Sequence, residues 1–305
     1  MMPFVTVLMA TFNGRQWIDE QVDSILNQKG VDVRLVVSDD GSTDGTREHL
    51  QARAQNEARI VVLPQRHGNP GVTENFLHLF TGHTPDGSFV AFSDQDDIWH
   101  SDKLSRQLQI LEDNAADVVS SNVLRFDETG KRVLIRKSSP QRKWDHIFEA
   151  AGPGSTYVFT PDAHKRIVDV LATLDYSQIG VHDWYLYALA RGIQAKWIID
   201  KHPTLDYRQH AGNVQGANVG TLARISRLNQ LKSGFYRDQF IKVAQAVAKS
   251  NTYSAKDRED LDQLIDLLQR DDFAARAALF LKWPQIRRIR WEGVQLAGAR
   301  LLGVW

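Results

Sequence analysis

The sequence predicts an α/β protein with a mostly parallel sheet, helices on both of its faces, and a helical C-terminal extension. Short apolar, β-branched runs alternate with helix-like segments through the first hundred residues, which is typical of repeated β-α-β units. The strand-like runs are apolar throughout, as expected when both faces of a parallel sheet are covered. From Gly212 onward, apolar residues recur at three- and four-residue spacing, which indicates helices.

The first half of the sheet follows from this alternation, element by element. The pattern predicts strands at residues 4–9, 33–37, 60–63 and 89–92, and helices at residues 16–27, 43–54, 72–80 and 101–113. In such sheets, ligands bind beyond the carboxyl ends of the strands. Three polar loops follow predicted strands, at residues 11–14, 38–42 and 93–97.

Beyond Val118 the predicted strands become shorter. The turn at residues 128–131 predicts a hairpin between strands 123–126 and 132–135. We then expect a strand at 156–159, helices at 161–173 and 182–191, and strands around Trp197 and Leu205. The C-terminal helices are expected at residues 228–247, 257–268 and 273–281.

The composition favours one or two globular domains. The 305 residues are 42% hydrophobic and include no cysteine, which excludes disorder, a disulfide framework and a thiol nucleophile. The 37 basic and 37 acidic side chains balance, so no general nucleic-acid binder is expected. Residues 1–97 nevertheless carry 14 acidic and 7 basic side chains. Without a secretory leader or a membrane-spanning apolar stretch, we expect a cytoplasmic protein.

Asp39 and Asp40 follow the strand expected at residues 33–37. Ser42 or Thr43 would suffice as the N-cap of the next helix, so two adjacent carboxylates need another explanation. Carboxylates at this strand end accept hydrogen bonds from a ribose in nucleotide-binding folds. We therefore expect a nucleotide at this loop.

Asp94, Asp96 and Asp97 follow the strand expected at residues 89–92. Three carboxylates in four positions repel one another unless a cation neutralises them. Oxygen ligands of this kind suit Mg²⁺ or Mn²⁺ bridging to a substrate diphosphate. The alternative is an acidic loop that caps the helix starting near Ser101, for which one carboxylate would be enough.

Two further residues have a structural and a functional interpretation. Asp183 lies in the first turn of a predicted helix, where it serves either the helix N-terminus or an acid–base reaction. His210 is either a surface histidine or a contact to phosphate or metal. Motifs for dinucleotide, P-loop, serine-hydrolase and zinc-protease chemistry do not occur.

Together, these motifs resemble those of family 2 glycosyltransferases over residues 3–215. The resemblance rests on Thr11-Phe12-Asn13, Asp39-Asp40-Gly41-Ser42, Asp94-x-Asp96 and Asp183. Phe92-Ser93-Asp94-Gln95-Asp96-Asp97-Ile98-Trp99, His182-Asp183-Trp184 and Tyr207-Arg208-x-His210 look like the rhamnosyltransferase-like members that build surface polysaccharides. The resemblance implies the GT-A fold and an inverting glycosyltransferase.

The resemblance also implies a donor site, a metal site and a catalytic base. The donor site would consist of Thr11, Phe12, Asn13, Asp39, Asp40 and Asp94. The metal site, for Mg²⁺ or Mn²⁺ on the diphosphate, would consist of Asp94, Asp96 and His210. Asp183 would deprotonate the acceptor hydroxyl, beside His182 where many members have Glu. The glycine-rich turn at residues 152–156 lies where the family places acceptor contacts.

The family pattern implies a catalytic domain at residues 1–215 and a helical region at 216–305. Within the domain, residues 1–117 would bind the nucleotide-sugar and residues 118–215 the acceptor. The donor would be a UDP- or dTDP-sugar, with rhamnose as one candidate sugar. The acceptor would be a saccharide or a lipid-linked saccharide. Because the Gln-x-x-Arg-Trp motif of processive synthases is missing, we expect a non-processive enzyme.

Two other functions stay open at this point. A nucleotidyltransferase also combines a nucleotide-binding fold with an aspartate pair and Mg²⁺. It needs a basic triphosphate loop after the first strand, where this chain offers only Arg15. The second alternative is a non-catalytic carbohydrate-binding protein that retains a transferase fold.

The C-terminal tail from Phe273 to Trp305 is basic and rich in apolar residues. It carries six Lys or Arg residues and one acidic residue, Glu292. This composition suits a helix on an anionic membrane surface at the inner face of the cell membrane. It equally suits an amphipathic helix packed on the catalytic domain.

Overall fold

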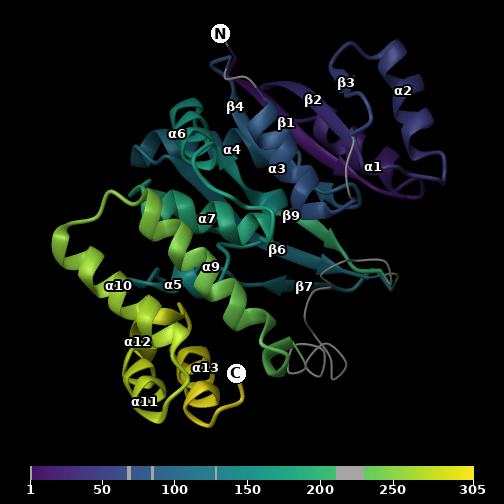
Figure 1. The fold of residues 1–305 in the computed structure, drawn as a ribbon. Coiled ribbons are helices and arrows are strands. Elements are labelled where there is room, and N and C mark those ends of the chain that lie inside the picture. The colour runs from purple at the N-terminus through teal and green to yellow at the C-terminus, as the bar shows by residue number, and fades with distance from the viewer. Residues whose placement is uncertain (1, 67–69, 84–85, 128, 211–229) are drawn as a thin grey trace. The chain divides into compact units, whose positions relative to one another are not determined.

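The computed structural model describes residues 2–66, 70–83, 86–127, 129–210 and 230–305 (Figure 1). The chain forms two compact units. The first unit comprises Met1–Ser138, Gly152–Ser177 and Ala195–His210, and the second comprises Ser139–Ala151, Gln178–Gln194 and Ala211–Trp305. Two segments placed in the catalytic domain by the sequence, 139–151 and 178–194, therefore group with the C-terminal helices.

The first unit contains the sheet, in the strand order β3-β2-β1-β4-β8-β6-β9-β5, with β7 paired to β6. Its parallel N-terminal half consists of β1 (Phe4–Thr11), β2 (Asp32–Asp39), β3 (Ile60–Val62) and β4 (Phe89–Ser93). The other half consists of β5 (Ile98–Trp99), β6 (Val118–Phe126), β7 (Arg132–Ile135), β8 (Val158–Phe159) and β9 (Trp197–Arg208). Of these, β6 and β9 pair in parallel, whereas β5, β7 and β8 join antiparallel.

Helices cover both faces of this sheet, as predicted (Figure 1). They are α1 (Ile18–Leu26), α2 (Thr46–Asn56), α3 (Val72–Gly82), α4 (Lys103–Asn114) and α6 (Pro161–Leu171). On one face, Val7 of β1 belongs to the same buried cluster as Val22 of α1 and Leu108 of α4. On the other face, Phe80 of α3 packs against the rings of Phe92 and Phe159. The buried runs of the sequence therefore form two apolar layers.

The later strands differ in detail from the prediction. The hairpin strand β7 has the predicted bounds, but β9 is one strand where two were expected, around Trp197 and Leu205. The pairing of β6 with β9 shifts register at Asn122. The Asn122 side chain donates a hydrogen bond to the Lys201 carbonyl at 2.7 Å, which satisfies a backbone group at this irregularity. Strand β5 is only two residues long and has no detectable pattern.

The second unit is helical. Its helices are α5 (Asp145–Phe148), α7 (His182–Gly192), α9 (Phe235–Ser250), α10 (Ala255–Gln269), α11 (Phe273–Leu281), α12 (Trp283–Ile286) and α13 (Arg290–Leu301). The predicted helix 228–247 corresponds to α9, and its first two residues lie outside the described part of the chain. The short helix α5 was not predicted, because one turn has no measurable periodicity.

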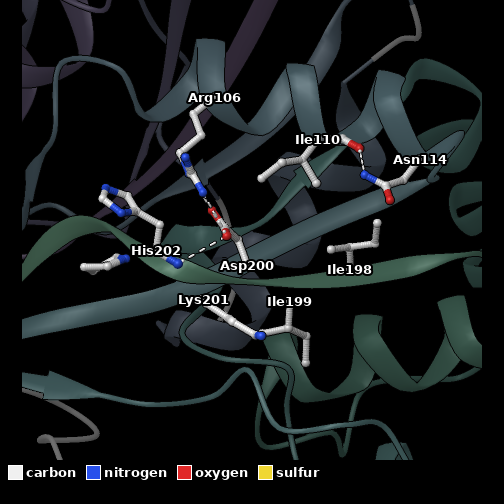
Figure 2. Close-up of a pocket in the computed structure, with 9 residues that line it drawn as sticks. Arg106, Ile110, Asn114, Ile198, Ile199, Asp200, Lys201 and His202 are labelled. Carbon is white, nitrogen blue, oxygen red and sulfur yellow. Dashed lines mark hydrogen bonds and ion pairs between the residues drawn. The ribbon is translucent and has the colours of Figure 1, made fainter.

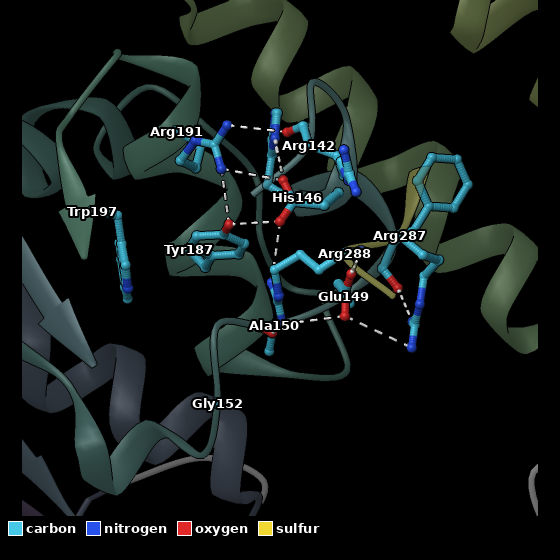
Figure 3. Close-up of polar contacts among 12 residues, drawn as sticks. Arg142, His146, Glu149, Ala150, Gly152, Tyr187, Arg191, Trp197, Arg287 and Arg288 are labelled. Carbon is cyan, nitrogen blue, oxygen red and sulfur yellow. Dashed lines mark hydrogen bonds and ion pairs between the residues drawn. The ribbon is translucent and has the colours of Figure 1, made fainter. Parts of the chain in front are cut away.

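A buried polar cluster joins α5, α7 and the segment after α12 (Figure 3). Asp145 is fully buried, and its carboxylate accepts hydrogen bonds from Tyr187 at 2.9 Å, from Arg191 at 3.2 Å and from Arg288 at 3.2 Å. Burial opposes the charged carboxylate, but hydrogen bonding to His146 and the two arginines lower the pKa of Asp145 to about 2. Asp145 is therefore ionised, and its charge holds α7 to the C-terminal segment.

The basic tail packs within the second unit. Leu279, Ile286, Ala297 and Trp305 are buried there. Five of its six basic residues pair with acidic groups, namely Arg276 and Arg300 with Asp271, Lys282 with Asp260, Arg287 with Glu292, and Arg288 with Asp145. Large apolar side chains of the tail stay exposed, and they are Phe273, Leu281, Ile289, Trp291 and Leu302. Among the helices that the structure describes, none is long and apolar enough to cross a membrane.

Candidate active site

The three polar loops singled out in the sequence meet at one edge of the sheet. Thr11, at the end of β1, is in register with Asp39, at the end of β2. Met9 of β1 is in register with Ser93, at the end of β4. Because these strands are parallel, the loops that follow them all leave the sheet at its carboxyl edge. The predicted donor and metal residues of these loops therefore lie together in the first unit.

Asp39 organises the loop that follows β2. It is fully buried. Its carboxylate accepts hydrogen bonds from the Thr11 hydroxyl at 2.9 Å, from the Ser42 hydroxyl at 2.6 Å and from the Gly41 and Ser42 amides at 3.1 and 2.9 Å. These four donors occupy the acceptor capacity of the carboxylate. Asp39, together with Thr11, thus holds the loop after β2 in place at the candidate site.

Asp40 has a partner, Arg66, that no sequence motif indicated. Its carboxylate pairs with Arg66 at 2.5 Å and accepts a hydrogen bond from the Gly71 amide at 2.5 Å. The side chains of Asp40 and Arg66 are only 9% and 11% exposed. Arg66 follows β3, whose carboxyl end lies at the same edge as those of β1 and β2, so topology was the signal that could have found it.

Phe12 and Asn13 form the loop that follows β1. Asn13 adopts a positive φ of 51°, which asparagine tolerates better than most residues. Its amide donates to the Ser42 hydroxyl at 2.8 Å, and its side-chain oxygen accepts from the Thr43 amide at 2.8 Å. Phe12 is 49% exposed. The loop therefore presents an open aromatic surface, of the kind on which a base stacks.

The acidic loop after β4 places Asp96 against His210. The Nε2 atom of His210 lies 2.7 Å from Asp96 Oδ2, and the imidazole stacks on Trp17 with 3.8 Å between the ring centroids. Arg208, at the end of β9, donates from Nε to the Asp96 carbonyl at 2.8 Å. These contacts bring the predicted metal residues Asp96 and His210 together, although they are 114 positions apart.

Asp97 has a different role from the two aspartates before it. It is buried, and its carboxylate accepts hydrogen bonds from the Ser155 hydroxyl and from the Arg208 amide, both at 3.1 Å. Burial, together with the nearby charges of Asp96 and Asp94, raises the pKa of Asp97 well above its usual value. Asp97 therefore joins the acidic loop to the glycine-rich turn at residues 152–156.

The oxygen-rich side chains of this loop fit a hard divalent cation. Mg²⁺ is usually bound by one or two carboxylates together with substrate phosphates, rather than by a complete set of protein ligands. Within the described residues, no three His, Asp or Glu side chains gather closely enough to bind a metal by themselves. Asp94 and Asp96 are carboxylates of the kind that could hold Mg²⁺ or Mn²⁺ together with a diphosphate.

Asp183 lies in the second unit, in the first turn of α7. One of its carboxylate oxygens accepts a hydrogen bond from the Trp184 amide at 2.5 Å, and the side chain is partly exposed. The neighbouring His182 is buried, and burial lowers its pKa to about 3. His182 is therefore neutral at physiological pH. The Trp184 indole anchors the helix by donating to the His146 carbonyl at 2.9 Å.

A separate surface pocket of about 610 Å³ lies between α4 and β9 (Figure 2). Arg106 and Asp200 form a bidentate ion pair at its centre, at 2.7 and 3.1 Å. None of the predicted site residues lines this pocket. Its most basic member is already neutralised by Asp200, so the candidate active site remains at the carboxyl edge of the sheet.

Comparisons with known proteins agree with this fold. The sequence model of glycosyl transferase family 2 matches residues 6–170. A dTDP-rhamnosyl transferase of Shigella flexneri, RfbG, is 38% identical over 246 residues, which cover 79% of this chain and 84% of that protein.

Two groups of solved structures show the same fold at low identity. Staphylococcus aureus TarS 1–349 in complex with UDP-GlcNAc superposes with a TM-score of 0.60 at 14% identity, covering 99% of this chain and 89% of that one. The mannosyltransferase PcManGT of Pyrobaculum calidifontis in complex with GDP-Man and Mn²⁺ has a TM-score of 0.52 at 17% identity, covering 99% and 75%.

The fold is that of a GT-A glycosyltransferase. The chain belongs to glycosyl transferase family 2, and it is similar to one dTDP-rhamnosyl transferase over most of its length. This assignment confirms the family and the fold expected from the motifs. It also favours a transferase over the nucleotidyltransferase and the non-catalytic protein that the sequence had left open.

Proposed function

We propose that this chain transfers rhamnose from dTDP-rhamnose to a hydroxyl of a saccharide acceptor, with inversion at the sugar carbon, during synthesis of a surface polysaccharide. The observation that carries the proposal is the 38% identity to a dTDP-rhamnosyl transferase over most of both chains. Two proteins that are this similar over most of their length share a function more often than two proteins that share only a fold. The structural neighbours, at low identity, support the fold alone.

The geometry of the first unit supports a nucleotide-diphosphate donor. The exposed Phe12 offers a stacking surface for a base. Asn13 beside it is hydrogen-bonded to the loop after β2, in which Asp40 pairs with Arg66 from the segment after β3. The Phe12 backbone is also hydrogen-bonded to Gln95 of the acidic loop, which contains Asp94 and Asp96. In a nucleoside diphosphate, a ribose joins the base to the diphosphate. One such ligand would therefore contact both the loop after β1, through its base, and the loop after β4, through its diphosphate.

We assign the acid–base step to Asp183. Its carboxylate removes the proton of the acceptor hydroxyl while that oxygen attacks the sugar carbon and the bond from this carbon to the diphosphate breaks. A Mg²⁺ or Mn²⁺ ion held by Asp94 and Asp96 supplies positive charge for the departing diphosphate. His182, which precedes Asp183 in the chain, is neutral at physiological pH because burial lowers its pKa to about 3.

The acceptor is proposed to be a lipid-linked saccharide at the inner face of the cell membrane. The exposed apolar side chains of the tail support contact with a membrane surface, because five large ones lie in the last 33 residues. Five of the six basic residues in the tail form ion pairs. The sixth, Arg290, has no carboxylate within 4 Å among the described residues. Insertion of apolar side chains, rather than electrostatic attraction alone, would then provide the binding.

A donor panel tests the proposal directly. Thermal unfolding is measured with UDP-, dTDP- and GDP-sugars in the presence of Mn²⁺, and dTDP-rhamnose should raise the midpoint most. Incubation with dTDP-rhamnose and a saccharide acceptor should yield a glycoside whose anomeric configuration, read by NMR, is opposite to that of the donor. If another nucleotide-sugar raises the unfolding midpoint more than dTDP-rhamnose does, dTDP-rhamnose is not the donor. If the product keeps the configuration of the donor, the mechanism is not inverting.

A further inference from the structure

The middle residue of the Asp94-x-Asp96 motif contacts the loop after β1 in an unusual way. Gln95 accepts a hydrogen bond from the Phe12 amide at Oε1 and donates one from Nε2 to the Phe12 carbonyl, both at 2.9 Å. One carboxamide thus pairs with both backbone groups of a single residue, as a neighbouring strand would. A carboxamide is the neutral side-chain group that both donates and accepts in this geometry.

Gly14 leaves the space that this contact requires. A Cβ atom built on Gly14 would clash with the Oε1 and Cδ atoms of the Gln95 carboxamide. The backbone of Gly14 does not need a glycine, because its φ lies outside the left-handed region. The absence of a side chain at position 14 therefore serves the approach of Gln95 and not the turn itself.

The contact joins the two loops between which a donor would lie. The loop after β1 is also bound to the loop after β2, through Asn13 with Ser42 and Thr43. Gln95 adds the connection to the acidic loop, directly between the two aspartates proposed for the diphosphate side. Phe12 and Asp96 are thereby held in one arrangement before any ligand arrives, which lowers the ordering cost of binding.

We propose that Gln95 is a positioning residue that aligns the nucleotide loop at Phe12 with the diphosphate loop at Asp94 and Asp96, and that Gly14 is its structural counterpart. The inference rests on the proposed function, because it assumes that a nucleotide-sugar spans these loops. Gln95 takes no part in the bond changes. Its loss should therefore weaken donor binding more than it slows the transfer of bound donor.

A double-mutant cycle separates this inference from a general effect on folding. Gln95→Ala removes both hydrogen bonds, and Gly14→Ala displaces the carboxamide, so each variant should raise the donor KM about tenfold while kcat changes less than threefold. In the double variant Gly14→Ala/Gln95→Ala, the added methyl no longer meets a carboxamide. The double variant should therefore also be about tenfold impaired, whereas independent effects would multiply to about a hundredfold.

The second measurement does not depend on turnover. Binding of dTDP is titrated by calorimetry in EDTA, without any added metal, and the affinity of Gln95→Ala should fall by a factor similar to its change in KM. Gln95→Glu keeps the acceptor for the Phe12 amide but places a carboxylate oxygen against the Phe12 carbonyl, so it should bind no better than Gln95→Ala. Gln109→Ala, which removes an exposed glutamine bound to Asp113 on α4, is the matched control and should bind dTDP normally.

The outcomes distinguish this inference from the proposed function. If the unchanged chain binds dTDP and Gln95→Ala binds it equally well, the positioning role is wrong and the function stands. Multiplicative effects in the double variant would also overturn the pairing of Gln95 with Gly14. If the unchanged chain binds no nucleoside diphosphate, the proposed function fails, and this inference with it.

Discussion

Arg288 and Asp145 form an ion pair inside the second unit, with Arg288 Nη1 3.2 Å from Asp145 Oδ2. Both side chains are almost fully buried, at 2% and 0% exposure, and the residues are 143 positions apart. Arg288 also pairs with Glu149 at 3.1 Å and donates to the Ala150 carbonyl at 2.6 Å. The C-terminal segment is thus part of the interior around α7, the helix that carries Asp183.

Arg288→Ala should destabilise the protein strongly. It leaves the buried carboxylate of Asp145 with one cation fewer, and breaking one side of a buried ion pair costs about 3–5 kcal/mol. The free energy of unfolding is measured by urea denaturation. Arg290→Ala, beside Arg288 but without a buried partner, should lose less than about 1 kcal/mol. Equal losses in the two variants would mean that the cluster around Asp145 does not stabilise the fold.

Asp183→Asn should abolish sugar transfer and leave nucleotide-sugar binding nearly unchanged, because the amide has no basic oxygen but keeps the shape of the side chain. Transfer is measured with dTDP-rhamnose, and binding by calorimetry. Asp162→Asn is the matched control, since Asp162 occupies the same position in the first turn of α6. If both variants keep full activity, Asp183 serves only the helix N-terminus.

Asp96→Ala should lose the part of nucleotide affinity that depends on Mn²⁺. The carboxylate would share the cation with the diphosphate, so its removal leaves only the contacts that operate without metal. Calorimetry of dTDP with Mn²⁺ and with EDTA measures the difference, which should vanish in the variant. Asp102→Ala, at the start of α4 and exposed, should keep it. A metal effect that survives in Asp96→Ala would place the cation elsewhere.

The buried His182 should make the stability depend on pH. Burial lowers its pKa in the folded protein to about 3, whereas the unfolded chain takes up a proton near pH 6.5. Between these values the unfolded state binds more protons, so stability falls as the pH falls. From pH 6.5 to pH 5.0 the loss due to His182 should be about 2 kcal/mol.

His182→Gln removes this titration, so its stability should decline less than that of the unchanged chain over the same interval. Urea denaturation at both pH values gives the comparison, and His202→Gln, at an exposed histidine, should behave like the unchanged chain. Parallel declines in all three proteins would mean that His182 is accessible to protons in the folded state.

Exchange of two exposed apolar residues tests membrane contact. Deleting the whole tail would also remove the buried Arg288, so point variants are the cleaner experiment. The double variant Trp291→Ser/Leu302→Ser should bind anionic vesicles about tenfold more weakly in a sedimentation assay, because two apolar side chains no longer insert. Val61→Ser, at an exposed apolar residue of β3, is the control. Unchanged vesicle binding in the double variant would reject the tail as the contact.

Much of the fold was predictable because its signals are local. The parallel strands β1 to β4 are buried on both faces, so each appears in the sequence as an apolar run, and the turn before Arg132 identifies the hairpin. No range was predicted for β5, α5 and α12, which are too short to show a period, or for α13, which lies in the segment expected only as an amphipathic tail. The long strand β9 appeared as two because its middle, residues 200–203, is polar and contains a proline, so apolar residues mark only the parts on either side.

The sequence by itself determined which residue types stand at the end of each strand, and therefore which chemistry the sheet edge offers: Asp39 and Asp40 at the end of β2, and Asp94 and Asp96 after β4. Only the tertiary structure decided what each carboxylate does. The carboxylate of Asp39 accepts hydrogen bonds from the loop it organises, and Asp40 pairs with Arg66. Asp96 is in contact with His210, and Gln95, between the two aspartates of its loop, is hydrogen-bonded to Phe12. These partners come from distant segments, and hydrogen bonds between them depend on the register of parallel strands rather than on sequence spacing.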